Sequence, residues 1–194
     1  MTTRLAVVVG STRPDRFAPT AARWFADVAR KHDDVEVDVV DLADHDVPVA
    51  PAGNDPAAGP PDGVRELGER LRRADAFVVV TPTYNRSFSA VLKAAIDWFY
   101  AEWSLKPVGF VSYGGASGGH LPIEQLRSVF TEFNAVPLKD AVVLREFWTE
   151  FDHDGRPVDR ERLARWASPL VEQLTWWSAT LRAGLAERPY PGTE

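Results

Sequence analysis

Three short segments of the chain concentrate side chains that could bind an anion or a flat ring. The first, residues 10–17 (GSTRPDRF), lies between an apolar run ending at Val9 and an amphipathic stretch that begins near Ala18. Free N–H groups at the start of a helix favour an anion, and so does the helix dipole. Ser11 and Thr12 could add hydroxyl donors, and Arg13 and Arg16 could add charge-assisted hydrogen bonds. The pattern predicts a phosphate site; a solvated strand-to-helix turn is the alternative.

This first segment matches neither of the common nucleotide-binding loops. It lacks the G-x-G-x-x-G spacing of dinucleotide folds and the G-x-x-x-x-G-K-[ST] spacing of NTPases. The phosphate of a mononucleotide is therefore the better prediction.

The second segment, residues 81–89 (TPTYNRSFS), follows another apolar run. Tyr84 offers a ring surface, and Asn85 offers an amide and tolerates a left-handed backbone. A flat heterocycle needs both a surface and polar groups in its plane. The alternative is a simple helix entry with Ser87 or Ser89 as the N-cap, and both interpretations can hold together.

The third segment, residues 113–120 (YGGASGGH), contains four glycines around Ala116 and Ser117. Glycines let a backbone approach a ligand closely or adopt positive φ. A flexible turn is the alternative interpretation of the same pattern.

The elements that must position these segments alternate between strands and helices. Strands are predicted over residues 4–9, 35–42, 77–81, 107–113 and 136–144, the second and fifth near sheet edges. Helices are predicted over residues 18–31, 62–73, 89–100, 122–133 and 159–185. Residues 47–61, rich in Pro, Gly and Ala, predict a surface loop. Such alternation indicates an open, doubly wound α/β sheet, whose ligands bind beyond the carboxyl ends of the strands. All three segments fall there, which predicts a single site.

Composition narrows the possible functions. The 194 residues, 45% of them hydrophobic, suit one sizeable domain, and the net charge of −6 argues against a dedicated nucleic-acid binder. The absence of cysteine excludes disulfides and thiol redox chemistry, so a bound cofactor must carry any electrons. The four scattered histidines predict no metal site. With no signal peptide and no apolar run of membrane-spanning length, a cytoplasmic location is expected.

Residues 4–145 resemble the NADPH-dependent FMN reductase family. The resemblance rests on Gly10-Ser11-Thr12-Arg13, on residues 82–87 (PTYNRS) followed by residues 92–98 (LKAAIDW), and on Lys106-Pro107 leading to the Tyr113-Gly114-Gly115 segment. It implies a flavodoxin-like three-layer α/β fold, with a five-stranded parallel sheet in the order 2-1-3-4-5 and helices on both faces. Residues 1–185 would form one domain, with residues 146–185 a variable extension and 186–194 a tail.

The resemblance also implies FMN as the cofactor and NADPH or NADH as the electron donor. Ser11, Arg13, Phe17 and Ala18 would hold the FMN phosphate, and Pro82, Tyr84, Asn85 and Ser87 would line the isoalloxazine ring. Tyr113, Gly114 and Gly115 would close its other edge, with Ser117 in the same loop. Thr83 and Arg86, also expected at the cofactor, depart from the glutamate and the smaller residue common in the family.

The implied reaction passes a hydride from NAD(P)H to N5 of FMN and then to a small acceptor such as free flavin, a quinone or an azo compound. No side-chain nucleophile or base is required, because the flavin carries the chemistry. Arg13, Arg16 and Arg86 are all candidates to meet the ribose phosphate of NADPH. Trp98 and Trp103 are candidates for the cofactor pocket, whereas Asp97 is expected to pair with Lys93. A homodimer or homotetramer is expected; the alternative function is a flavodoxin-type electron carrier.

Overall fold

Parallel strands form the centre of the molecule. The computed structural model describes residues 2–50, 59–116 and 118–191. In this part of the chain the strands are β1 (Thr3–Val9), β2 (Val35–Asp41), β3 (Ala76–Pro82), β4 (Pro107–Gly114), β5 (Val136–Pro137) and β6 (Val142–Arg145). All pairs are parallel, in the order β2-β1-β3-β4-β5, and β6 also pairs with β4. The predicted α/β class and strand order are confirmed.

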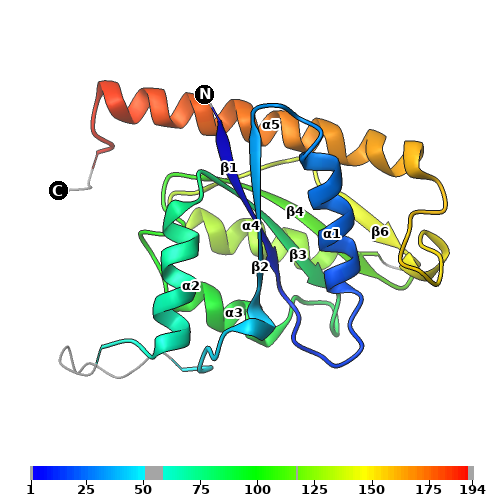
Figure 1. Ribbon diagram of the computed structural model, residues 1–194. Coiled ribbons are helices and arrows are strands. Elements are labelled where there is room, and N and C mark those ends of the chain that lie inside the picture. The colour runs from blue at the N-terminus through cyan, green and yellow to red at the C-terminus, as the bar shows by residue number, and fades with distance from the viewer. Residues whose placement is uncertain (1, 51–58, 117, 192–194) are drawn as a thin grey trace.

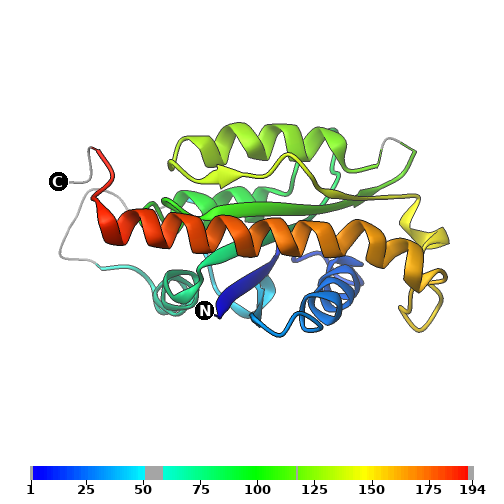
Figure 2. The same cartoon turned by 90° about the horizontal axis from the view of Figure 1, so that it is seen from above.

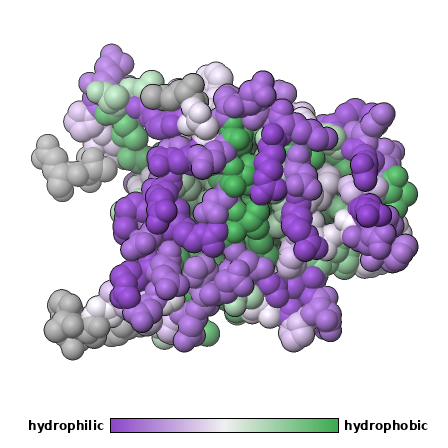
Figure 3. Space-filling model, in the orientation of Figure 1, coloured by the Kyte–Doolittle hydropathy of each residue, from purple (hydrophilic) through white to green (hydrophobic). Residues whose placement is uncertain are grey.

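Burial along the strands explains this order. Every residue of β3 and β4 is buried, as expected for strands covered on both faces. β2 instead alternates half-buried valines with exposed acidic residues, and it forms one edge of the sheet. The space-filling view shows a hydrophobic strip along β2 between hydrophilic helices (Figure 3). The alternating pattern of residues 35–42 therefore predicted an edge strand correctly.

The single fifth strand predicted over residues 136–144 is wrong in one respect, because it is divided into β5 and β6. Pro137 has no N–H to donate. The side chain of Arg127 donates hydrogen bonds to the carbonyl oxygens of Leu138 and Lys139, at 3.1 Å for Leu138. These carbonyls therefore face a helix side chain instead of a neighbouring strand, and the ladder resumes only at Val142.

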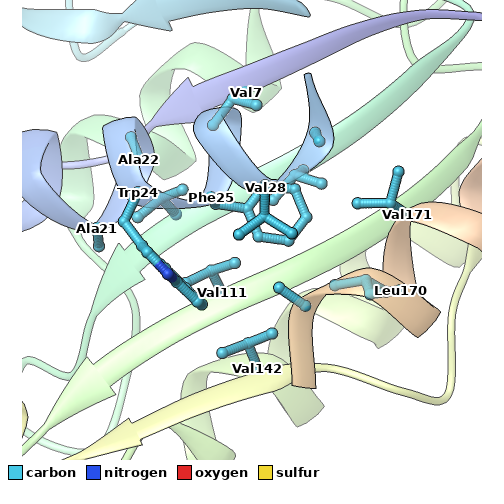
Figure 4. Close-up of a cluster of buried hydrophobic side chains, with 14 of the residues drawn as sticks. Val7, Ala21, Ala22, Trp24, Phe25, Val28, Val111, Val142, Leu170 and Val171 are labelled. Carbon is cyan, nitrogen blue, oxygen red and sulfur yellow. The ribbon is translucent and has the colours of Figure 1, made fainter. Parts of the chain in front are cut away.

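Helices cover both faces of the sheet. They are α1 (Ala18–Ala29), α2 (Asp62–Arg73), α3 (Ala90–Asp97), α4 (His120–Thr131) and α5 (Arg160–Glu187), with short 3₁₀ turns η1 (Leu42–Asp44) and η2 (Phe147–Thr149). One core packs α1 and α5 against the sheet, and a second core packs α2, α3 and α4 against the opposite face (Figure 1). In the first core, Phe25 of α1 and Leu170 of α5 lie over Val111 of β4 (Figure 4).

The long helix α5 is part of this core and runs along the whole molecule (Figure 2). Its buried side chains, from Leu163 to Leu174, belong to the α1–α5 core. Near its end, Arg182 lies 3.3 Å from the Asp75 carboxylate, which also pairs with Arg4 at 3.1 Å. None of the helices in the described parts of the chain is long and apolar enough to cross a membrane.

Only the ends of the predicted 47–61 loop, residues 47–50 and 59–61, lie within the described residues. Near one of those ends, the Pro48 carbonyl accepts a 2.8 Å hydrogen bond from the Trp98 indole.

Candidate functional site

The three predicted segments meet at the carboxyl edge of the sheet. They leave β1, β3 and β4, which are neighbours in the sheet. The hydroxyl of Ser11, from the first segment, is buried and lies 3.2 Å from the Tyr84 hydroxyl of the second. The second segment is joined to the third by the Thr83 N–H, which donates a 2.8 Å hydrogen bond to the Tyr113 carbonyl. Direct contacts thus link the first segment to the second and the second to the third.

Tyr113 is held as a neutral phenol. Burial raises the pKa of the Tyr113 hydroxyl well above its usual range, and nearby Tyr84 raises that pKa further. Hydrogen bonds with the Ser11 hydroxyl and the Ala18 N–H lower the pKa but do not offset burial. A tyrosine is already neutral at pH 7, so the shift extends the range in which the phenol is protonated to more alkaline pH.

The first segment leaves backbone donors free at the start of α1. The N-cap, Phe17, has no side-chain cap, and Pro19 lies in the first turn. Among the described residues, none accepts a hydrogen bond from the N–H groups of Ser11, Thr12 or Arg13. The Arg13 side chain is exposed and makes no ion pair within the described parts of the chain. These donors and this cation are suited to an anion.

Arg16 has a different role from the one that its spacing suggested. Its guanidinium donates a 2.6 Å hydrogen bond to Asp41, at the end of β2. Asp41 also accepts from the Ala43 N–H at 3.0 Å and so caps η1. Arg16 therefore fixes the first segment to β2, although its Nε atom is buried without a partner in the described structure.

The side chains of Phe17 and Ala18, both expected at the phosphate, pack toward the interior. The Phe17 ring packs into an aromatic cluster, 4.3 Å from the Phe147 ring centroid and 5.1 Å from that of Tyr113. Ala18 is fully buried, and its N–H contacts the Tyr113 hydroxyl. The Phe17 side chain thus packs against other aromatic rings beneath the first segment.

The second segment forms a tight hairpin. Tyr84 and Ser87 exchange two backbone hydrogen bonds of 2.8 and 2.9 Å, and Asn85 and Arg86 between them have φ of 46° and 73°. Positive φ at both central residues is characteristic of a type I′ turn. The left-handed Asn85 was predicted; the left-handed Arg86 was not.

A residue of α4 braces this hairpin. Gln125 accepts a 2.6 Å hydrogen bond from the Ser87 hydroxyl and donates one of 3.1 Å to the Arg86 carbonyl. Ser89, one of the two predicted N-caps, caps α3 by accepting from the Leu92 N–H, and it also donates to the Gly10 carbonyl. The hairpin is therefore held from two sides.

Pro82 and Thr83 connect the second segment to the third. Pro82 is the last residue of β3 and is buried, in register with Tyr113. The Thr83 N–H donates a 2.8 Å hydrogen bond to the Tyr113 carbonyl, and the Thr83 hydroxyl donates one of 2.7 Å to the Gly118 carbonyl. Thr83 thus stabilises the glycine loop.

Most glycines of the third segment are required by the protein's own packing. A Cβ on Gly119 would lie 2.2 Å from the Ser112 Cβ, and one on Gly114 would lie 2.7 Å from the Gly118 carbonyl. Gly118 has φ of 61°. At Gly115, by contrast, the Trp148 ring, at 3.8 Å, is the only group among the described residues that a Cβ would meet. The packing of the described residues therefore does not require a glycine at position 115; Ser117 lies outside these residues.

The structure also places the Lys93–Asp97 pair and the two tryptophans that were candidates for the cofactor pocket. Lys93 and Asp97 form the expected surface pair, at 2.6 Å. Trp103, a candidate for the cofactor pocket, is a core residue instead: its ring is 1% exposed and packs between Phe77 and Phe130. Trp98 packs against the core formed by α2, α3 and α4.

The sequence interpretation missed Asp41, Gln125 and Trp148. Asp41 and Gln125 act on residues far away in the chain, and no local pattern marks them. Trp148 follows β6 at the same edge of the sheet, a position that could have indicated a role. No cluster of three or more His, Asp or Glu side chains among the described residues could hold a metal ion.

Comparisons with known proteins agree with this geometry. A model of the NADPH-dependent FMN reductase family matches residues 3–150. An NAD(P)H-dependent FMN reductase of Schizosaccharomyces pombe is 33% identical over 150 residues, 74% of each chain. A quinone reductase of Pseudomonas putida is 30% identical and covers 92% of this chain and 96% of its own.

Among solved structures, the flavoenzyme NAD(P)H:(acceptor) oxidoreductase FerB of Paracoccus denitrificans is similar, with a TM-score of 0.73 and 25% identity. The similarity covers 92% of this chain and 98% of that one. The expected flavodoxin-like fold is thereby confirmed, and the relatives are reductases, not flavodoxin-type carriers. The chain belongs to the NADPH-dependent FMN reductase family and is an NAD(P)H-driven, FMN-dependent oxidoreductase.

Proposed function

We propose that the three segments hold FMN at the carboxyl edge of the sheet and that the acceptor is a quinone. The observation that carries the cofactor assignment is the convergence of the three segments, which the Ser11–Tyr84 hydroxyl contact and the Thr83 hydrogen bonds to Tyr113 and Gly118 join at one edge of the sheet. The quinone is supported by the similarity to the quinone reductase of Pseudomonas putida.

The residues present fit the phosphate end of FMN. Three consecutive backbone N–H groups, from Ser11 to Arg13, have no acceptor within the described residues, and the adjacent start of α1 is uncapped. Arg13 would supply the charge-assisted hydrogen bond. Arg16 would position the segment through Asp41 and not touch the phosphate directly.

The residues present also fit the ring end. Gly115 has only the Trp148 ring near it among the described residues, and the 84–87 hairpin carries Tyr84 at the same edge of the sheet. The Asn85 and Arg86 N–H groups, which have no acceptor in the described parts of the chain, would stabilise negative charge at the edge of the ring.

When bound, FMN supplies the redox chemistry: it accepts a hydride from NAD(P)H and delivers it to the acceptor. The protein would hold the flavin and orient the two reactants. Among the three arginines considered for the ribose phosphate of NADPH, Arg16 is paired with Asp41 and Arg13 is assigned to FMN. Arg86, whose side chain has no partner within the described residues, is the remaining candidate.

The test compares the wild type with Arg13→Ala. We expect wild-type protein incubated with FMN and desalted to retain a flavin absorption band that NADPH bleaches anaerobically. Arg13→Ala should raise the FMN Kd by about tenfold or more, because a charged hydrogen bond contributes about 1.5–3 kcal/mol. Its melting temperature should not change, since Arg13 makes no ion pair with any described residue.

Arg23→Ala is the matched control, because Arg23 is an exposed arginine of α1 that contacts only Thr20 among the described residues. Equal FMN affinity in wild type and Arg13→Ala would show the phosphate assignment to be wrong. A wild type that neither retains FMN nor reduces it as a substrate would contradict the cofactor site itself.

A cytoplasmic location, assembly into a homodimer or homotetramer, and a single domain over residues 1–185 stay predictions. Light scattering after size-exclusion chromatography measures the assembly directly.

A further inference from the structure

Trp148 is a large exposed side chain beside the candidate site. It lies on η2, three residues after the end of β6, and is 58% exposed. Among the described residues, its ring is the one group that a Cβ on Gly115 would approach, at 3.8 Å. Since Gly115 is proposed to border the flavin ring, the Trp148 indole lies beside that proposed position.

The backbone around Trp148 is firmly held. Glu146, before it, has φ of 46°, and its carbonyl accepts hydrogen bonds from the Thr149 N–H and hydroxyl at 2.8 and 2.9 Å. Phe147 stacks on Phe17 in the aromatic cluster, and Glu150 pairs with Arg162 of α5. A left-handed residue that is not glycine costs free energy and is retained where the fold requires it. The turn therefore presents the exposed indole in a defined position.

A cationic side chain approaches the same glycine loop as the Trp148 ring, because Gly115 and Gly118 are joined by a 2.8 Å backbone hydrogen bond. Arg145, at the end of β6, is in register with Gly114 of the site. Its Nε atom lies 3.8 Å from where a Cβ of Gly118 would be. The Arg145 side chain is exposed and makes no hydrogen bond or ion pair with the described residues.

We infer that Trp148 and Arg145 form the acceptor subsite, which takes a quinone with its ring on the indole and a carbonyl oxygen at the guanidinium. An electron-poor flat ring stacks favourably on the electron-rich indole. Reduction adds a hydride from the reduced flavin and a proton from water, which converts the quinone to the hydroquinone. A guanidinium would stabilise the negative charge that develops on the carbonyl oxygen. The inference rests on the proposed function.

The test compares two acceptors in the same FMN-loaded enzyme: a benzoquinone, which can stack, and ferricyanide, which cannot. The measured quantity is the ratio of kcat/KM for the quinone to kcat/KM for ferricyanide. Trp148→Ala should lower this ratio about three- to tenfold, as expected for the loss of an aromatic contact. Trp148→Phe should retain most of the wild-type ratio. Arg145→Ala should lower the ratio by lowering kcat/KM for the quinone.

Trp176→Ala is the matched control. Trp176 is 60% exposed, lies in the middle of α5, and contacts Trp177. Its substitution should leave the acceptor ratio at the wild-type value.

A second readout does not depend on turnover. Titration of the oxidised, FMN-loaded enzyme with the quinone, without NADPH, is followed by the perturbation of the flavin absorption band. The quinone Kd should rise about three- to tenfold in Trp148→Ala. A merely structural role for Trp148 would instead lower the melting temperature and leave this Kd unchanged.

Several outcomes would overturn the inference. One is an unchanged ratio and an unchanged quinone Kd in Trp148→Ala and Arg145→Ala while NADPH oxidation continues, which leaves the proposed function intact. Another is a change of oligomeric state in Trp148→Ala, which would make Trp148 a subunit contact. If the wild type oxidises NADPH with neither acceptor, the proposed function fails and the inference fails with it.

Discussion

The tightest turn of the site contains a residue whose backbone is strained. Arg86 has φ of 73°, where the Cβ of an L-residue crowds the backbone at a cost of about 1–2 kcal/mol. Asn85, beside it, has φ of 46°, but Asn tolerates this region far better. Gln125 and the Tyr84–Ser87 hydrogen bonds hold the turn in place. The strain is thus maintained by contacts from the turn itself and from α4.

Arg86→Gly should relieve this strain. We expect the free energy of unfolding of the FMN-free protein to rise by about 1 kcal/mol, because glycine adopts positive φ without a Cβ penalty. Urea denaturation monitored by circular dichroism measures the change. Asn85→Gly is the control and should gain less; a variant Arg86→Gly no more stable than wild type would refute the strained turn.

The type of a residue and its neighbours predicted much of the site, but not which partner each side chain has. Ser11, Tyr84 and Tyr113 could be placed together, because strand ends in an open sheet meet at one edge. Arg13 and Arg16 have the same local chemistry, and only the distant Asp41 distinguishes them. Such a contact forms only when the chain folds, so no pattern of neighbouring residues in a single sequence predicts it.

Among the elements, α5 is attached to the rest of the molecule at both ends by charge. At its start, Arg162 pairs with the buried Glu150, and near its end Arg182 pairs with Asp75. Burial of Asp75 alone would raise its pKa. Hydrogen bonds from the Arg4 side chain and N–H and the charge of Arg182 outweigh this effect, and the pKa is lowered. Asp75 therefore stabilises the fold as a carboxylate.

Asp75→Asn should weaken the attachment of α5. It removes the charge that Arg4 and Arg182 share, and we expect the free energy of unfolding at pH 7 to fall by about 2 kcal/mol. In the wild type, this contribution is present above the unfolded pKa of the carboxyl and is lost as pH falls through the lower folded pKa. Denaturation curves at pH 7 and pH 3 measure it.

Asp27→Asn provides the matched control, since Asp27 pairs with Arg30 on the surface and its side chain is 72% exposed. It should change the free energy of unfolding by less than about 0.5 kcal/mol. Equal stability of Asp75→Asn and Asp27→Asn would contradict a structural role for Asp75.

The existence and order of the elements were easier to predict than their ends. Apolar runs such as Phe77–Thr81 are long enough to identify a buried strand on their own. The break between β5 and β6 was not predictable, because it depends on Arg127 of α4 reaching the Leu138 and Lys139 carbonyls. The same holds for Trp103, whose place in the core depends on Phe77 and Phe130 from other elements.

In the whole molecule, two cores flank one sheet, and the site occupies the carboxyl edge between them. Tyr113 belongs to the α1–α5 core, and Phe17 packs against it. Phe17 is also the last residue of the first segment, and Tyr113 is the first residue of the third. The extension from Phe147 onward packs into the same core. The interior that stabilises the fold is therefore continuous with the residues beneath the first and third segments.

At the opposite edge of the sheet, Lys106 makes the stability of the whole molecule depend on pH. Its ammonium donates to the Leu71 and Arg72 carbonyls at 3.1 and 3.3 Å and lies 5.3 Å from the Phe77 ring centroid. Burial lowers the pKa of Lys106 to about 8, from 10.5 for a free lysine, and this effect exceeds the opposing attraction of Asp75 and Glu102.

Between pH 8 and 10.5 the unfolded chain therefore binds more protons than the folded one, so stability rises with pH. We expect urea denaturation to show a rise of about 1–2 kcal/mol from pH 7.5 to 9.5 that Lys106→Met abolishes. The exposed Lys139 is the control, and Lys139→Met should retain the rise. The raised pKa of Tyr113 acts in the opposite direction only above the unfolded tyrosine pKa of about 10, outside this window. A wild-type curve that is flat or falling over this range would show that Lys106 keeps its charge at the ordinary pKa, and the burial of its ammonium would then carry no cost to the fold.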